Sequence, residues 1–144
     1  MKKYILFLFC FFSLVPNAQE ISAHYNQILI TNVGYTCVET TAPDPCAGDQ
    51  IYATIKITQE NILISEKTVS SCGEENLIEI GRYSWKQVGN KIMIEYPEER
   101  YMYAKIISLE LKPNEIVGKI EYPNGNISKK TFEEDKKPLI VTKA

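Results

Sequence analysis

Along most of this chain apolar and polar residues alternate one by one, the pattern of a β-strand with one buried and one solvated face. The segment 51–58 shows it best, because isoleucine or alanine occupies each odd position and tyrosine, threonine or lysine each even one. Turn residues separate this run from others like it. The runs cover residues 25–38, 51–58, 62–69, 78–86, 92–96, 104–111, 116–122 and 127–132.

These runs predict an all-β fold of about eight strands with short connections, an order typical of antiparallel meanders. We expect a small antiparallel up-and-down, lipocalin-like barrel, because closure removes exposed sheet edges. A β-sandwich is the alternative. Asn124-Gly125 is the strongest hairpin signal, since both residues tolerate the positive φ of a type I′ turn. The segment 98–112 can also be written as a helix, but its isoleucines favour a strand.

The amino terminus has the three-part layout of a secretory signal peptide. Lys2 and Lys3 form a positive start, residues 4–15 form an apolar run, and residues 16–18 end on the small side chain of Ala18. We expect cleavage near Ala18 and export to the periplasm or the medium. A membrane anchor is the rival interpretation, but the apolar run is shorter than the roughly 20 residues that span a bilayer. We therefore expect no membrane anchor.

The domain organisation follows from the length of the chain. Removing the signal peptide, residues 1–18, from the 144-residue chain leaves enough for one domain with one core. We expect a single β-barrel in residues 19–132, a charged mobile tail in residues 133–144, and a monomer. Two of the 16 basic residues leave with the signal, while all 18 acidic residues stay. This net negative charge disfavours nucleic acid as a partner, since nucleic acid binds to positively charged patches.

Three of the four cysteines follow the predicted cleavage site, and export favours their oxidation in pairs. If strands at 50–58 and 62–70 form a hairpin, facing residues have numbers that sum to about 119. Cys46 and Cys72 then lie at the open end of this hairpin and form the preferred disulfide. A Cys37–Cys46 bond is the alternative.

Cys37 and His24 are weak candidate metal ligands. Three thiols and the only histidine could compose a Cys₃His site, but their spacing lacks the close cysteine pairs of zinc sites. An exported protein also favours disulfides over free thiolates. We therefore expect no metal and no other cofactor.

An ordered set of motifs runs from residue 45 to residue 94. It comprises Pro-Cys-Ala at 45–47, a predicted hairpin, Gly-x-Tyr-x-Trp at 81–85 and Gly-Asn at 89–90. This order resembles the amino-terminal barrel of the NlpE-type copper-resistance lipoproteins, and the resemblance implies a barrel in the cell envelope. Asp49 stands where the family has a second cysteine, and the lipidation signal of the family is missing. The resemblance therefore does not imply that this chain binds copper.

The sequence contains no signature of catalysis. Nucleophile elbows, Walker loops, dinucleotide fingerprints and paired-histidine zinc motifs are all missing from it. A single histidine also leaves little acid–base chemistry. We therefore expect that the chain is not an enzyme.

Two binding functions remain as hypotheses. The first is an exported, non-enzymatic binding protein, a barrel for a small ligand or with a copper-related role, whose site is lined by Tyr83, Trp85, Tyr96 and Tyr122. The same aromatic residues also suit an ordinary core. The alternative is an envelope or secreted module that binds a protein partner, as a sensor or an inhibitor. Its candidate contacts are the loops 40–48, 71–76 and 101–103, since exposed tyrosine and methionine suit interfaces.

Overall fold

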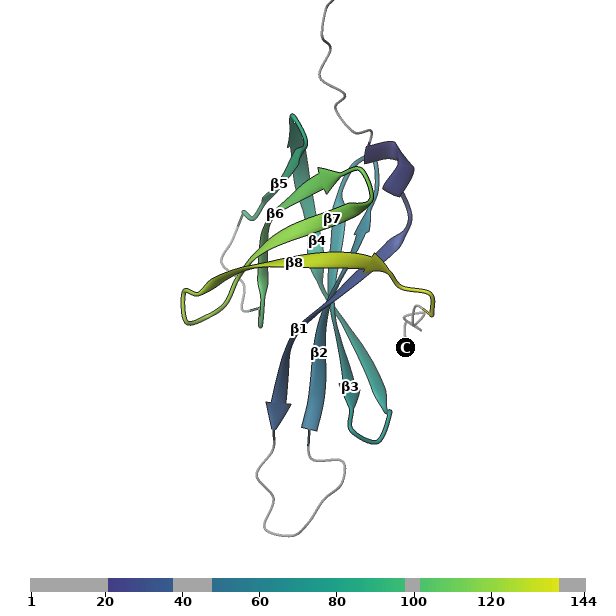
Figure 1. Ribbon diagram of the computed structural model, residues 1–144, viewed down its shortest axis with the longest axis vertical. Coiled ribbons are helices and arrows are strands. Elements are labelled where there is room, and N and C mark those ends of the chain that lie inside the picture. The colour runs from purple at the N-terminus through teal and green to yellow at the C-terminus, as the bar shows by residue number, and fades with distance from the viewer. Residues whose placement is uncertain (1–20, 38–47, 98–101, 138–144) are drawn as a thin grey trace, which may run out of the picture.

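The protein folds as a closed eight-stranded antiparallel barrel (Figure 1), seen in a computed structural model that describes residues 21–37, 48–97 and 102–137. Each strand pairs with its neighbour in sequence, and β1 closes the barrel against β8. The strands are β1 (Ile28–Cys37), β2 (Gly48–Ile57), β3 (Ile62–Ser70), β4 (Glu75–Val88), β5 (Lys91–Glu95), β6 (Lys105–Lys112), β7 (Glu115–Glu121) and β8 (Ile127–Glu134). The predicted up-and-down barrel is confirmed, and the β-sandwich is excluded.

The alternation in the sequence becomes the inner and outer faces of the barrel. The odd-numbered residues of β2 from Ile51 to Ile57 are at most 5% exposed and form one wall of the core. Pairing of β2 with β3 keeps the predicted sum of 119, from Asp49 opposite Ser70 to Ile57 opposite Ile62. The predicted hairpin register is therefore confirmed. Each isoleucine buried in this way contributes about 1.5–3 kcal/mol to folding.

The barrel has a closed end and a mouth. At the closed end a short 3₁₀ helix, η1 (Ile21–His24), inserts Ile21 into the core, and the Asn26 amide donates to the Ile57 carbonyl at 2.8 Å. We call the opposite end the mouth, where the β1–β2, β3–β4, β5–β6 and β7–β8 connections lie. In Figure 1 the β1–β2 and β3–β4 strand pairs extend beyond the other strands at this end.

Part of the segment 98–112, whose sequence also suits a helix, forms a strand, β6. β6 buries Ile106, Leu109 and Leu111. A register irregularity between Ile106 and Ser108 in its pairing with β7 shifts the alternation within the strand. The preference for a strand over a helix is therefore confirmed for residues 105–112.

The turn after β7 differs from the predicted type I′ turn. Gly125 has a φ of 80°, whereas Asn124 is not among the described residues with positive φ. The Asn126 amide instead donates to the side-chain oxygen of Asn124 at 3.0 Å, and the Tyr122 amide donates to the Asn126 carbonyl at 2.9 Å. The predicted hairpin between β7 and β8 is therefore confirmed, but its turn is not of type I′, since Gly125 alone has positive φ and the Asn124 side chain accepts a backbone hydrogen bond.

β8 extends two residues into the segment predicted as a charged tail. Glu133 and Glu134 pair with Ile30 and Leu29 of β1. Asp135 follows, and its amide donates to the Ile28 carbonyl at 2.8 Å. The ordered barrel therefore runs past residue 132, while residues 138–144 lie outside the described part of the chain.

The predicted signal peptide, residues 1–18, also lies outside the described residues. Cleavage near Ala18 and export therefore stay predictions. Within residues 21–37, 48–97 and 102–137, no helix is long and apolar enough to cross a membrane.

Candidate functional site

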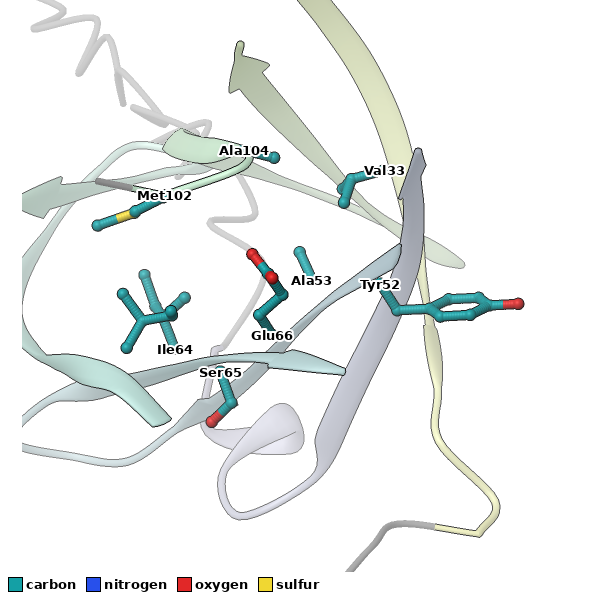
Figure 2. Close-up of a pocket in the computed structure, with 9 residues that line it drawn as sticks. Val33, Tyr52, Ala53, Ile64, Ser65, Glu66, Met102 and Ala104 are labelled. Atoms are coloured by element: carbon teal, nitrogen blue, oxygen red, sulfur yellow. The ribbon is translucent and has the colours of Figure 1, made fainter. Parts of the chain in front are cut away.

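A small cavity lies inside the barrel near the mouth (Figure 2). Four strands and the β5–β6 connection supply its lining, which consists of Val33, Tyr52, Ala53, Ile64, Ser65, Glu66, Ile80, Met102 and Ala104. Its volume is about 10 Å³, which is room for one water-sized group. Pockets for drug-sized ligands occupy about 300–1,000 Å³. This cavity can therefore enclose one small chemical group.

Among the lining residues that the structure describes, Glu66 is the only one with a charged side chain. It lies on β3, opposite Ala53 of β2 and Ile78 of β4, at the inward position that follows Ile64. Figure 2 shows its carboxylate pointing over the cavity toward Met102 and Ala104. Glu66 is half-buried and forms no hydrogen bond or ion pair with any residue that the structure describes. The cavity thus combines apolar walls with one unpaired carboxylate.

Tyr83 contributes a second polar group without a partner. Its side chain is 6% exposed, and its hydroxyl is the one buried side-chain polar atom in the described residues that makes no hydrogen bond. The hydroxyl lies over Gly81, where a Cβ atom would meet it at 2.8 Å. Gly81 pairs with Ile64, which lines the cavity. Because a buried hydroxyl without a partner costs about 1–3 kcal/mol, its position over Gly81, the partner of the lining residue Ile64, requires an explanation.

The aromatic residues predicted to line a ligand site do not line this cavity. Tyr83 and Tyr96 contact each other with ring centroids 4.6 Å apart, and the Tyr96 hydroxyl donates to the Ile106 carbonyl at 2.8 Å. Burial, with Tyr83 beside it, raises the pKa of the Tyr96 phenol above its usual range. These two residues therefore form a packed pair in the middle of the barrel.

Trp85 and Tyr122 are separated from that pair. The Trp85 indole donates to the Thr58 carbonyl at 3.1 Å, in the β2–β3 turn at the closed end. Tyr122 follows β7 at the mouth, where its ring meets Tyr103 edge-on at 6.3 Å. The structure thus brings Tyr83 and Tyr96 together and leaves the other two at opposite ends.

Sequence reasoning missed Glu66 as a site residue, and it named Met102 only as an exposed contact for a protein partner, whereas Met102 is 8% exposed and lines the cavity. The run 62–69 does not alternate cleanly, so its polar residues gave no indication of which face they occupy. The hairpin register did indicate that Glu66 faces inward, because a sum of 119 places it opposite the inward-facing Ala53. Met102 could not be found in this way, since it lies in a connection outside the strands.

The predicted cysteine pair lies at the mouth end of the β2–β3 hairpin. The Gly48 carbonyl accepts hydrogen bonds from the Ser71 amide at 2.8 Å and the Ser71 hydroxyl at 3.0 Å. The hairpin thus stays in register up to the residue before Cys72. Cys37 is an exposed free thiol at the end of β1. Cys46 lies outside the described residues, so the Cys46–Cys72 bond stays a prediction.

The weak metal candidates cannot share an ion. His24 lies at the closed end, where its Nδ1 is 3.2 Å from the Gln27 side-chain oxygen. Cys37 lies at the far end of β1, a strand of ten residues that spans roughly 30 Å. Among the described residues no group of three or more His, Cys, Asp or Glu side chains could hold a metal.

A wider groove of about 520 Å³ crosses the outside of the closed end. Leu29, Ile116 and Phe132 form its apolar floor. On its rim, the Lys112 ammonium donates to Glu115 at 2.8 Å, which raises the pKa of the lysine and lowers the pKa of the carboxyl. Glu133 and Glu134 also line this groove but are exposed, so its described charges are either paired or in contact with solvent.

The chain was compared with known proteins. Neither a protein family, nor a curated protein, nor a solved structure matches it. The resemblance to the NlpE-type barrel therefore stays a prediction, and function must be argued from the residues at the mouth.

Proposed function

We propose that this chain is an exported, non-enzymatic binding protein that holds a small ligand at the mouth of its barrel, with Glu66 as the orienting contact. The observation that carries this proposal is the unpaired Glu66 carboxylate over an apolar cavity. Partial burial of a charge costs free energy unless a partner compensates it. A ligand that pairs with Glu66 recovers that cost on binding.

The size of the cavity favours binding at the mouth over enclosure in the barrel. Its 10 Å³ holds one small group, and the isoleucines below it, including Ile55 and Ile57, are at most 1% exposed. A bulky lipophilic ligand would have to displace this packed core, whose density resists rearrangement. The ligand therefore inserts one end and leaves the rest in the opening.

The chemistry of the lining favours binding over catalysis. Its described part, residues from β1 to β4 with Met102 and Ala104, contains a single charged side chain. Acid–base catalysis usually needs an acid and a base that face each other across the substrate. Glu66 alone is better suited to orient a ligand.

Thermal melting of the purified protein tests this function. The panel comprises short alcohols, carboxylates and amines, with copper and zinc salts, because a ligand that binds only the folded state raises the melting temperature. At least one class should raise the melting temperature of the wild type but not that of Glu66→Gln. Glu79→Gln is the matched control, since Glu79 is exposed on neighbouring β4. A flat response to the whole panel overturns the proposal.

Exposed apolar side chains on the extended strands favour a second candidate, the binding of a protein partner. Tyr35 on β1 and Ile78 on β4 are 49% and 50% exposed. β4 pairs with β5 only from Ser84 onward, so its segment 75–83 has β3 as its one partner among the described strands. Such an edge can accept an added strand. Affinity capture with wild type and Ile78→Lys tests this candidate, because the charge should abolish recovery of a specific partner, and equal recovery would exclude this edge.

A further inference from the structure

We propose that the mouth site selects a primary alkylammonium ion, with the ammonium group in the cavity against Glu66, on the side where the Tyr83 hydroxyl lies over Gly81. This inference rests on the proposed function and names its ligand class. Charge, size and hydrogen-bonding capacity each lead to the same ligand.

The negative charge of Glu66 favours a cationic ligand. Glu66 supplies the only formal charge among the described lining residues, and the side chains around it are mostly apolar. A low-dielectric environment strengthens the attraction between opposite charges. The neighbouring Lys67 does not neutralise Glu66, because its ammonium lies 3.2 Å from Glu75 and 3.8 Å from Asp135. None of the residues that the structure describes neutralises Glu66, so we expect a ligand to supply the cation.

The size of the cavity limits which cation can enter. Its volume of about 10 Å³ accepts one group of the size of water. A primary ammonium group is a compact point charge, whereas a guanidinium is a wide planar fork. A trimethylammonium group adds three methyl groups around the nitrogen. The cavity therefore selects the unmethylated ammonium.

Hydrogen bonding connects the ammonium to both unpartnered groups. The Tyr83 hydroxyl lies over Gly81, opposite Ile64, and Glu66 occupies the next inward position of β3. Alternate residues of a strand are roughly 6–7 Å apart. Two hydrogen bonds of about 2.9 Å from one tetrahedral nitrogen join two oxygens that are roughly 4.7 Å apart, so the rotatable Glu66 side chain has to bring its carboxylate toward the hydroxyl. An ammonium has three donors, so it can donate to the carboxylate and to the phenolic oxygen together.

The apolar part of the lining suits the carbon chain of the ligand. Figure 2 shows Met102, Ala104 and Val33 across the cavity from Glu66. The flexible methionine side chain can adapt to an alkyl chain. The methylene group next to the ammonium therefore meets the edge of these side chains, and the rest of a short unbranched alkylamine leads out through the mouth.

Isothermal titration calorimetry in phosphate buffer at constant ionic strength tests the proposal. The probes are n-butylammonium chloride, n-butanol and butyltrimethylammonium chloride. We expect n-butylammonium to bind at least tenfold more tightly than either analogue. Glu66→Gln should weaken its binding at least tenfold, and Tyr83→Phe about three- to tenfold. The control Glu79→Gln should bind like the wild type, and melting curves check that each variant is folded.

Each other outcome counts against the inference. Equal binding of butanol, or full affinity in Glu66→Gln, would show that the charge plays no part. Absence of n-butylammonium binding to the wild type also overturns the inference. If another class of ligand then raises the melting temperature in a Glu66-dependent way, the proposed function survives alone. If no ligand of the panel binds, the inference and the proposed function are both wrong.

Discussion

At the scale of single residues, the most informative side chain is Tyr83. Its hydroxyl is buried over Gly81 without a hydrogen bond. A phenylalanine would keep the ring contact with Tyr96 and remove the unsatisfied oxygen. The tyrosine thus lowers the stability of the unliganded protein, which is consistent with retention for ligand binding.

Tyr83→Phe should therefore stabilise the unliganded protein by about 1 kcal/mol, because the cost of a buried unpaired hydroxyl disappears. Urea denaturation of wild type and variant measures the difference. Tyr96→Phe is the control and should lose stability, since the Tyr96 hydroxyl donates to the Ile106 carbonyl. A loss of stability in Tyr83→Phe would mean that the hydroxyl has a partner in solution.

Tyr96 also gives the fold a dependence on alkaline pH. Burial first, and Tyr83 second, raise the pKa of its phenol, so the folded state favours the neutral form. The stabilisation is complete below the unfolded pKa of about 10 and is lost as the pH rises above it. Ultraviolet titration should show Tyr96 ionising only with unfolding, whereas Tyr96→Phe should lack this component. Ionisation of Tyr96 in the folded protein near pH 10 would contradict the burial argument.

At the scale of elements, the β2–β3 hairpin is the part that sequence reasoning predicted best. Its register follows from the strict alternation of residues 51–58 and a short turn, both of which are local. The register irregularities between Asn32 and Gly34 in β1, and between Ile64 and Ser65 in β3, were not predictable. A bulge depends on the twist that neighbouring strands impose, so sequence alone does not locate it.

The same hairpin carries a prediction about the disulfide. Cys46→Ser and Cys72→Ser should each destabilise the protein by about 3–4 kcal/mol, because the bond closes a loop of about 27 residues in the unfolded chain. Cys37→Ser should have no effect, since Cys37 is an exposed free thiol. Chemical denaturation with and without reductant measures these changes. A stability loss in Cys37→Ser would indicate the alternative Cys37–Cys46 pairing.

At the scale of the whole molecule, the barrel and its closure were predictable, whereas the site was not. Closure of the barrel was predicted from the number of alternating runs, and in the structure β8 pairs with β1 to close it. The cavity depends on side chains from distant segments, including Val33, Glu66 and Met102, which meet only in the folded barrel. The ordered start of the tail likewise depends on the contact of Asp135 with Lys67, which is remote in sequence.

The central claim, that a ligand binds at the mouth, is tested most directly by methionine-methyl NMR. Of the three methionines, Met1 belongs to the predicted signal peptide, Met93 is half-buried on β5, and Met102 lines the cavity. Addition of the ligand class that raises the melting temperature should shift the Met102 methyl signal and leave Met93 unchanged. A shift of Met93 alone, or no shift of Met102 at saturation, would contradict binding at the mouth.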